Sequence, residues 1–578
     1  MASSGNFATW NPLANTTAGL NYAGSVYSNG NTRFRGNTGG TATTQLTHGL
    51  SSGKWYIEIY IDGSPASGFP MIGIVASGVN SSTLQNTSNA SALTITSDLQ
   101  TVNGTKRVFG STSSTSYGSG FSDGDICQMA IDIDNGKIWW GKNNTWFASG
   151  NPAGGSNAGD TFTGGTEMMV FVGSYSGSAY SICNAGQDSS FSGNKTSGSA
   201  NAQDGMGFGN FFYAPPSSGD TKFLALCSAN LPISDDIDPA QTDTDYPSKQ
   251  FNTVLYTGTG SAQSIDAGLQ ADFVWAKNRG SQSHRLADST RGSAVLFSDS
   301  DVAEDTTAGI SFDSDGFNWT NTDGSNANDS SANYVAWCWK ANGGTTANNT
   351  TGGTNSVTQA NTKSGFSIIT YTGFSGSSGS STVGHSLTKA PEFIIHKSRT
   401  RSSGWWCQHT GLTNAGYFID LSGTAGQNNL SGYGTMNAPT TSVFTINGVD
   451  GVGGESANYV SYAWHSVSGF SRFGSFEGNA DNDGIFCYLG FKPSFIFIKN
   501  IDASQHWVSH DSARETFNPM DTPIDLDGSY AEYTSSARAI DITSNGFKCR
   551  TSDGEINANQ TYIYGAWAST PYRYNNSF

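Results

Sequence analysis

Residues 332–341 read Ala-Asn-Tyr-Val-Ala-Trp-Cys-Trp-Lys-Ala, and related phrases recur at residues 457–466 and 560–569. In each copy a tyrosine is followed five positions later by a tryptophan, as in Tyr334 and Trp339. Aromatic and β-branched residues dominate the phrase, and Asn, Ser and Gly flank it. The pattern therefore predicts three equivalent β-strands.

A second strand pattern, Phe-(Val or Ile)-x-x-Lys, precedes each phrase and begins at Phe273, Phe393 and Phe495. The closing tryptophan follows about 70 residues later in every copy, and such a fixed period identifies a repeat array. We predict β-repeats at residues 251–345, 346–468 and 469–578. They follow an N-terminal domain at residues 1–232 and an acidic linker at 233–250, and a Gly- and Asn-rich linker at 342–362 separates the first two copies.

Composition supports an all-β chain. Glycine accounts for 72 of 578 residues and charged residues for only 13%, against typical values of roughly 7% and about 25%. No long window has helical periodicity, whereas short apolar runs between Gly, Asn, Ser and Asp recur throughout. We expect the repeats to be small domains of sandwich or jelly-roll type.

Charge and hydropathy limit the kinds of partner and the cellular location that we expect for the protein. The formal net charge of −17 argues against a nucleic-acid partner, because such binders usually carry a basic surface. The first ten residues lack the apolar core of a signal peptide, and no run approaches the ~20 apolar residues that membrane insertion needs. Seven cysteines, an odd number, lie mostly in strand-like runs, so we expect buried free thiols and synthesis in a reducing cytoplasm.

The N-terminal domain carries ordered motifs. Gly-Lys-Trp-Tyr-Ile-Glu at residues 53–58 is a half-buried strand, and the run from Gly124 to Asp134 turns at Asn135-Gly136 into a Trp-Trp strand. Asn-Gly between two such runs predicts a β-hairpin. With Asn-Ala-Gly-Gln at residues 184–187, these motifs resemble those of SPRY (B30.2-like) domains. The resemblance covers about the first 200 residues and implies a two-sheet β-sandwich that binds partners through its loops without catalysis.

The order of an SPRY-like domain and β-repeats resembles the C-terminal half of tail-associated structural proteins of bacteriophages, particularly marine ones. The matching features are the Phe-x-x-x-Lys strands, the Gly-Phe pairs before the final strands, and the aromatic ending at residues 571–574. The resemblance implies a virion component. We expect a non-enzymatic tail fibre or tail-tip protein, made in the host cytoplasm and acting as a homotrimer. Its partners would be other virion proteins and a host-surface glycan or protein.

Two alternatives remain open: a capsid decoration protein and a glycan depolymerase. No Gly-x-Ser-x-Gly elbow, His-Glu-x-x-His motif or Walker loop occurs, so we expect no catalytic residue. A depolymerase needs only two carboxylates at a suitable separation, which sequence cannot locate. The Trp-x-x-His pairs ending at His409 and His510 are interpreted as a shared strand whose contents vary.

We also expect no metal and no cofactor. The Asp132-x-Asp134-x-Gly136 run imitates the start of a calcium loop, but its twelfth position is Asn143, which cannot serve as a bidentate carboxylate. The glycan-contact candidates are four aromatic residues outside clear strand alternation, which we expect to be exposed in Gly- and Ser-rich loops, and aromatic rings provide rigid contact faces. These candidates are Tyr117, Trp146, Trp405 and Tyr433.

Overall fold

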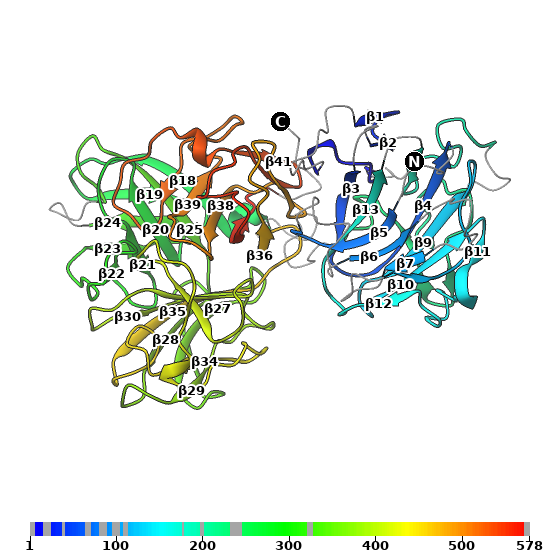
Figure 1. Ribbon diagram of the computed structural model, residues 1–578. Helices are drawn as coiled ribbons and strands as arrows, with labels where there is room; N and C mark the ends of the chain where they lie inside the picture. Colours follow the sequence, from blue (N-terminus) through cyan, green and yellow to red (C-terminus); the bar gives the residue numbers. More distant parts are fainter. Residues whose placement is uncertain are drawn as a thin grey trace. The chain divides into compact units, whose positions relative to one another are not determined.

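The computed structural model describes residues 6–14, 25–36, 41–63, 71–79, 90–94, 105–107, 114–175, 179–196, 202–231, 246–320 and 327–570. Strands joined by turns and short 3-10 helices make up these ranges, so the all-β prediction is confirmed (Figure 1). The chain forms two compact units, residues 1–232 with 485–490 and residues 233–484 with 491–578. The predicted linker at 233–250 lies outside the described residues up to residue 245.

The first unit is a sandwich of two sheets, whose strands pair antiparallel except for β17, which pairs parallel with β4. One sheet has the order β1-β2-β14-β4-β9-β10-β11, with β12 on β10 and β17 on β4, and the other has the order β3-β13-β5-β6-β7-β8. The elements of this unit are η1 (Pro12–Ala14), β1 (Val26–Ser28), β2 (Arg33–Arg35), β3 (Thr41–Leu50), β4 (Lys54–Asp62), β5 (Met71–Ala76), β6 (Ala90–Thr94), β7 (Thr105–Arg107), β8 (Ser114–Ser116), β9 (Ile126–Asp132), β10 (Lys137–Lys142), β11 (Thr145–Trp146), η3 (Phe147–Ser149), β12 (Asp160–Thr161), β13 (Met168–Tyr175), β14 (Tyr180–Asn184), β15 (Ser217–Ser218), β16 (Thr221–Lys222) and β17 (Leu224–Ala225).

The predicted Asn-Gly hairpin joins β9 to β10, with Asp132 opposite Lys137. Gly136 has φ +58°, and a Cβ there would lie 1.9 Å from the carbonyl oxygen of Phe162, so only glycine fits this turn. The Asp132 carboxylate accepts two hydrogen bonds from Asn135, one from the backbone N–H and one from the side-chain amide. Asp132, the first residue of the calcium-like run, therefore forms hydrogen bonds within its own hairpin.

Two of the quoted N-terminal motifs meet at Glu58, which is fully buried in β4. Its carboxylate accepts hydrogen bonds from the Tyr56 hydroxyl, the Asn184 amide and the backbone N–H groups of Phe212 and Tyr213, at 2.7–3.1 Å. Burial raises the pKa of Glu58 to about 7, against the opposing effect of these donors. The side chain thus fastens the segment around residue 212 to the central strand.

The second unit contains the three repeats except residues 485–490, and each repeat has a large sheet and a small sheet. The large sheets have the orders β18-β25-β20-β21-β22, β26-β27-β28-β35-β30-β31-β32-β33 and β36-β43-β38-β39-β40. Repeat one comprises η5 (Pro247–Lys249), β18 (Phe251–Thr257), β19 (Gln263–Asp266), β20 (Phe273–Asn278), β21 (Arg285–Asp288), β22 (Val295–Leu296), β23 (Ile310–Phe312), β24 (Gly316–Trp319) and β25 (Asn333–Trp339).

Repeat two comprises β26 (Ala347–Asn349), β27 (Ser356–Asn361), β28 (Phe366–Thr372), β29 (Ser380–Gly384), β30 (Phe393–Ser398), β31 (Trp406–His409), β32 (Tyr417–Asp420), β33 (Asn428–Asn429), η6 (Ser431–Tyr433), β34 (Val443–Asn447) and β35 (Asn458–Trp464). Repeat three comprises β36 (Ser471–Glu477), β37 (Phe486–Tyr488), β38 (Phe495–Asn500), β39 (Trp507–Asp511), β40 (Ile524–Asp525), η7 (Ser536–Arg538), β41 (Ile540–Thr543), β42 (Gly546–Cys549) and β43 (Thr561–Trp567). The two predicted strand patterns are neighbours in every repeat: β25 with β20, β35 with β30, and β43 with β38.

The three repeats share one hydrophobic core. Strand alternation explains it, because Val335, Trp337 and Trp339 of β25 face the shared core, while Ala336 and Cys338 face the interior of repeat one. Each large sheet thus has a private face, covered by its small sheet, and a common face. The predicted boundaries mark sequence repeats that pack as one unit rather than as separate domains.

Three equivalent tryptophans lie at the centre of the shared core. The ring centroids of Trp339, Trp464 and Trp567 are 5.3–6.0 Å apart in all three pairs, with interplanar angles of 62–75°. Such edge-to-face contacts are a favourable arrangement for aromatic rings. The cavity left among the surrounding rings is about 10 Å³, close to the smallest space that holds a water, so the centre is filled.

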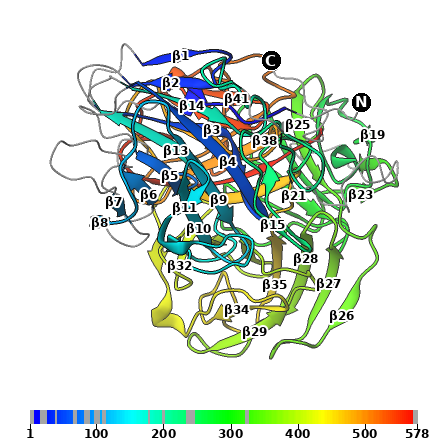
Figure 2. The same ribbon diagram turned by 90° about the vertical axis from the view of Figure 1, so that its right-hand side faces the viewer.

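The prediction of a linker at residues 342–362 is wrong. Its residues include all of β26 and β27, and β27 pairs with β28 along six residues. Strands β26, β27, β28 and β35 run side by side in Figure 2. The segment is rich in Asn, Thr and Gly because its strands lie at a sheet edge and face solvent in part.

One position breaks the equivalence of the closing strands. Trp337 and Tyr462 occupy it in repeats one and two, whereas repeat three has Gly565. A Cβ on Gly565 would lie 2.4 Å from the Phe497 ring and 3.0 Å from the Phe473 ring. These phenylalanines therefore fill the space that an aromatic residue fills in the other copies.

We expect Gly565→Ala to destabilise the second unit by about 1–3 kcal/mol, because overpacking of a filled core forces neighbouring rings to move. The control is Gly469→Ala, since a Cβ at Gly469 meets nothing within 4 Å, although its φ of +77° adds local strain. Urea denaturation monitored by tryptophan fluorescence measures both changes. Equal stability of Gly565→Ala and the parent protein would contradict the packing described here.

Candidate functional site

The repeats are joined head to tail in a closed ring by one recurring backbone hydrogen bond. Glu304 donates its N–H to the carbonyl of Arg399, Gln427 donates to Ile501, and Glu532 donates to Arg279, at 2.9–3.0 Å. The first two bonds join consecutive repeats, and the third joins repeat three to repeat one. Residues with the same place in this framework are therefore equivalent, and what differs between repeats stands out.

A second tie crosses the same joints. Trp405 donates its indole N–H to Phe297 O at 2.8 Å, and Trp507 donates to Asp420 O at 2.9 Å. His284 takes this position in repeat one. Its Nδ1 accepts from the Trp275 indole, so its Nε2–H donates to Asp525 O at 3.0 Å. Each joint is thus held by one ring N–H that reaches a carbonyl of the neighbouring repeat.

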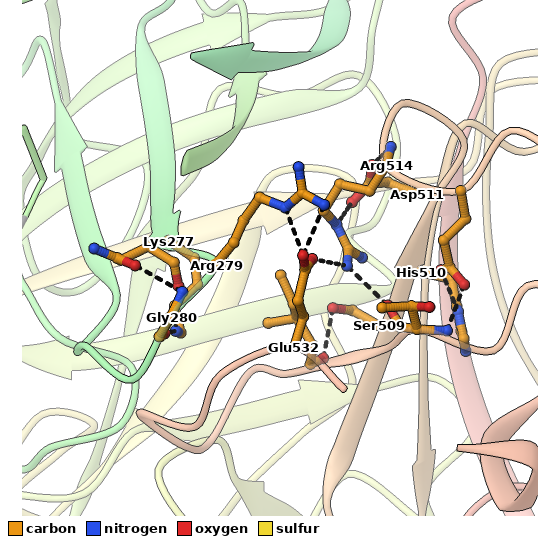
Figure 3. Close-up of polar contacts among 12 residues, drawn as sticks. Lys277, Arg279, Gly280, Ser509, His510, Asp511, Arg514 and Glu532 are labelled. Carbon is orange, nitrogen blue, oxygen red and sulfur yellow. Dashed lines mark hydrogen bonds and ion pairs between the residues drawn. The ribbon is translucent and has the colours of Figure 1, made fainter. Parts of the chain in front are cut away.

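Buried charges add to the joint between repeats three and one (Figure 3). Arg514 pairs with Asp511 at 2.6 Å and with Glu532 at 3.1 Å, and Glu532 pairs with Arg279 at 2.7 Å. The Asp511 side chain is fully buried, and it accepts a hydrogen bond from the Trp337 indole at 3.3 Å.

The joint between repeats one and two uses the same chain of charges, through Asp288, Arg291, Glu304 and Arg399. The joint between repeats two and three does not. There His409, Leu412, Gln427 and Ile501 take the equivalent places, and Leu412 and Ile501 belong to the shared core. Equivalent positions are therefore filled by ion pairs in two of the joints and partly by apolar side chains in the third.

The strand with the Trp-x-x-His pairs is confirmed as shared, with one shift in register. Phe273 pairs with Asp288, Phe393 with His409, and Phe495 with Asp511. His510 therefore lies one residue away from the position of His409. It is buried and bonds to Glu515 and to the carbonyl of Arg538, at 2.8 and 2.9 Å.

The four aromatic residues singled out as glycan contacts are spread over both units. Trp405 is fully buried in the joint between repeats one and two, so its expected exposure is wrong. Tyr117 is only 8% exposed, because Trp140 and Phe147 pack edge-on against its ring, and this expectation is wrong too. Trp146 is half-buried, and Tyr433 is exposed in η6.

Repeat three carries exposed aromatic rings on the long segment between β39 and β41. Tyr530 is 59% exposed and Tyr533 is 41% exposed. Tyr530 packs edge-on against His506, with ring centroids 5.9 Å apart, and the Arg538 guanidinium lies 5.3 Å from the centre of the Tyr533 ring. We call these four residues, with the three carboxylates described next, the repeat-three cluster.

Asp525, Asp527 and Glu555 hold the side chains of His506 and Arg538 in place. His506 bonds to Asp527 at 2.9 Å, and its backbone N–H donates to Glu555 at 3.1 Å. Arg538 pairs with Asp525 and, at 3.0 Å, with Glu555. The hydrogen bond that Asp527 accepts from the His506 ring raises the pKa of His506, while burial raises the pKa of Asp525.

One member of this cluster, His506, has no counterpart of its kind in the other repeats. Asp527 has a framework role, because it caps the N–H of Trp507 just as Asp299 caps His284 and Asp420 caps Trp405. The residue before each capped position is His506 in repeat three, Ser283 in repeat one and Gly404 in repeat two. A side chain that the framework does not require is the better candidate for function.

A groove of about 470 Å³ crosses the large sheet of repeat two. Its lining comes from four adjacent strands and the Arg399 loop and is dominated by amide and hydroxyl side chains, among them Asn348, Asn349, Thr370 and Asn458. These groups donate and accept hydrogen bonds. The predicted linker hairpin supplies one wall, so sequence reasoning placed these residues outside any folded surface.

Within the described ranges, no helix is long and apolar enough to cross a membrane, and no three His, Cys, Asp or Glu side chains gather as possible metal ligands. All seven cysteines are buried and unpaired, as the sequence predicts.

A family model described as "Domain of unknown function (DUF7483)" matches residues 246–571, more than half of the chain. The chain belongs to this family. The DUF7483 match begins just before β18 and ends just after β43, so it spans all three repeats and the joint that closes their ring. Apart from residues 485–490, the DUF7483 region thus lies within one compact unit.

Solved structures similar to this chain include SPRY domains, as the sequence resemblance predicts. The SPRY domain of human HERC1 is 16% identical, with a TM-score of 0.23, covering 30% of this chain and 96% of that domain. The PSpry domain of TRIM65 is 10% identical, with a TM-score of 0.22, covering 31% and 92%. The carbohydrate-binding module CBM66 from Bacillus subtilis is 10% identical, with a TM-score of 0.20, covering 31% and 93%. No functional statement about the DUF7483 protein follows from these similarities, and no curated protein matches it.

Proposed function

We propose that this DUF7483 protein is a non-enzymatic attachment protein of a bacteriophage particle and that its repeat-three cluster contacts a glycan on the host surface. The observation that carries the glycan part is the pair Tyr530 and Tyr533, exposed beside fixed charges. Aromatic faces stack on sugar rings, and charged side chains that flank them bond to hydroxyl groups. The phage part rests on the sequence resemblance given above.

The cluster is organised before any ligand arrives. His506 and Arg538 are each held by two acidic residues, and Asp525 and Asp527 are buried. Binding therefore orders few side chains, and rigid contacts lose less free energy to entropy than flexible ones. The two tyrosines have few rotatable bonds, which has the same effect.

The proposal includes placement on the tail and a homotrimeric state. A capsid decoration protein would locate to the head instead, which immunogold electron microscopy of phage particles distinguishes. A depolymerase would release reducing ends from host polysaccharide, which a colorimetric assay detects. The carboxylates of the cluster are all paired with His506, Arg538 or backbone donors, which favours binding over hydrolysis.

We expect Tyr530→Ala with Tyr533→Ala to weaken binding of the full chain to immobilised bacterial capsular polysaccharide or lipopolysaccharide by at least tenfold. Two stacking contacts of about 0.7 kcal/mol each are enough for this change. The matched control is Tyr246→Ala, because Tyr246 is also an exposed tyrosine of the same unit, at 40%. Surface plasmon resonance measures the affinities.

Equal loss in the double variant and the Tyr246→Ala control would show that exposed tyrosines act nonspecifically. Unchanged binding in the double variant would place the glycan contact elsewhere. Absence of binding by the parent chain to every bacterial polysaccharide tested would overturn the proposed function itself.

A further inference from the structure

Repeat two contains a cavity of about 240 Å³ that the framework does not explain. It lies beside β30 and β31, and loops at residues 410–417 and 438–439 form its walls. The lining includes Pro391, Glu392, Gln408, Asn414, Tyr417 and Pro439. Apolar walls with a few polar groups are typical of a small-molecule site.

At the equivalent places in the other repeats, the polar side chains bond within the chain. In repeat one, Asp272 corresponds to Glu392, and its carboxylate accepts four hydrogen bonds, from Ser289, Ala341, Gly343 and Gly344. A carboxylate with two oxygens is well satisfied by four donors. No acceptor there is left for a ligand.

Repeat three closes the position with different side chains. Ser494 replaces the acidic residue and bonds to Ser569 at 2.5 Å. His510 occupies the place of Gln408, and Glu515 and Arg538 O use both of its ring nitrogens. The side chains that line the cavity of repeat two therefore differ from those at the equivalent positions of repeats one and three.

The polar groups of repeat two are only partly used within the chain. Glu392 accepts one backbone N–H, that of Ser466, through Oε2. Gln408 donates its amide N–H to Thr445 O at 3.2 Å, and the Asn414 carbonyl accepts the N–H of Gly416 at 2.9 Å. In the described part of the chain, the Glu392 Oε1 atom has no hydrogen-bond donor.

We propose that this cavity binds a single uncharged pyranose ring, the terminal sugar of a glycan. The inference rests on the proposed function and assigns it a second contact, separate from the repeat-three cluster. The volume lies below the roughly 300–1,000 Å³ of sites for drug-sized ligands, so it admits one ring and not a chain.

The lining selects the class of sugar. Glu392 and the side-chain carbonyls accept hydrogen bonds from ring hydroxyls, while Tyr417 and the two prolines offer flat apolar faces to the C–H side of the ring. The carboxylate of Glu392 repels acidic sugars such as uronic or sialic acids, because like charges at close range are unfavourable. The ligand is therefore a neutral hexose or N-acetylhexosamine.

The test is a titration of the full chain with methyl glycosides of glucose, galactose and mannose, with N-acetylglucosamine, and with glucuronate and choline as charged probes. Saturation-transfer NMR reports contact, and isothermal calorimetry reports affinity. The blocking variant is Ala415→Trp, because Ala415 lines the cavity and is half-exposed, so a larger side chain enters the cavity without entering the core. The control is Thr413→Trp, an exposed position on the same loop.

We expect binding of at least one neutral sugar, a loss of more than tenfold in Ala415→Trp, and full binding in Thr413→Trp and in the Tyr530→Ala, Tyr533→Ala double variant. No neutral sugar bound at millimolar concentration overturns the cavity proposal. Preference for choline that Glu392→Gln abolishes also overturns it, in favour of a cation site. Either failure leaves the proposed function standing if the double variant still loses polysaccharide binding.

Discussion

Lowering the pH from 7 to 4 is expected to unfold the three-repeat unit. His284, His396 and His409 are buried, and burial lowers their pKa values from 6.5 to about 4, about 3 and about 4. As the pH falls below 6.5, the unfolded chain therefore binds protons that the folded chain does not. The stability that these neutral histidines provide above pH 6.5 is lost as the pH approaches 4.

The size of the effect decides the outcome. One pKa unit corresponds to about 1.4 kcal/mol, so each histidine costs on the order of 3 kcal/mol at pH 4. The combined cost of the three histidines is comparable to the ~5–15 kcal/mol that keeps a typical domain folded. Urea denaturation at pH 7.5, 6, 5 and 4, monitored by tryptophan fluorescence, measures the loss.

His396 offers the matched variant. Its ring packs against Phe418 and Phe444, its Nδ1 atom meets the Ser461 hydroxyl, and its Nε2 atom has no hydrogen-bond partner among the described residues. His396→Phe keeps an aromatic ring and removes one titrating group. We expect its stability to fall by about 3 kcal/mol less than that of the parent between pH 7 and 4. Identical pH profiles for the two proteins would contradict this account.

Replacing Arg514 by leucine is expected to destabilise the second unit by about 3–5 kcal/mol at pH 7.5, because it leaves the Asp511 carboxylate buried without its cation. Both side chains are at most 1% exposed, so water cannot replace the lost partner. Repeat two has Leu412 at this place, but beside His409 rather than an aspartate. The double variant Asp511→His with Arg514→Leu copies that pair and is expected to recover most of the lost stability.

Arg550→Leu is the control for charge removal. Arg550 pairs with Asp541 at 3.2 Å, but its side chain is 41% exposed, and exposed pairs contribute about 0–1 kcal/mol. Chemical denaturation at constant pH compares the variants. If Arg514→Leu lowers the free energy of unfolding no more than Arg550→Leu does, the buried charges do not stabilise the ring of repeats.

The sequence predicts much of this fold because strand patterns are local. The Tyr-Val-Ala-Trp phrase and the Phe-x-x-x-Lys pattern identify β25 and β20, and the same patterns identify their counterparts in the other copies. Alternation shows that both faces of these strands are apolar. It does not show which surface covers each face, so the shared core around Trp339, Trp464 and Trp567 could be found only from the structure.

The candidate site was harder to predict for the same reason. Trp405 follows a Gly- and Ser-rich loop, which suggests exposure, yet it crosses to repeat one and bonds a carbonyl there. A better signal was comparison between repeats. The segment Gly-Ser-Tyr-Ala-Glu-Tyr at residues 528–533 gives repeat three two tyrosines in a polar loop, and that difference marks Tyr530 and Tyr533.

Ring closure also determines how a growing chain can fold. Arg279 and Glu532 are 253 residues apart in sequence, so the contact between them has a very high contact order, and such contacts form slowly. While the ribosome is still adding repeat three, the common faces of the first two repeats lack the cover that repeat three supplies, and Phe251 and Trp339 lack their contacts with Phe495 and Trp567. Exposed aromatic surface of this kind promotes aggregation. A partly synthesised chain of this kind is therefore more prone to aggregation than a chain of independently folding domains.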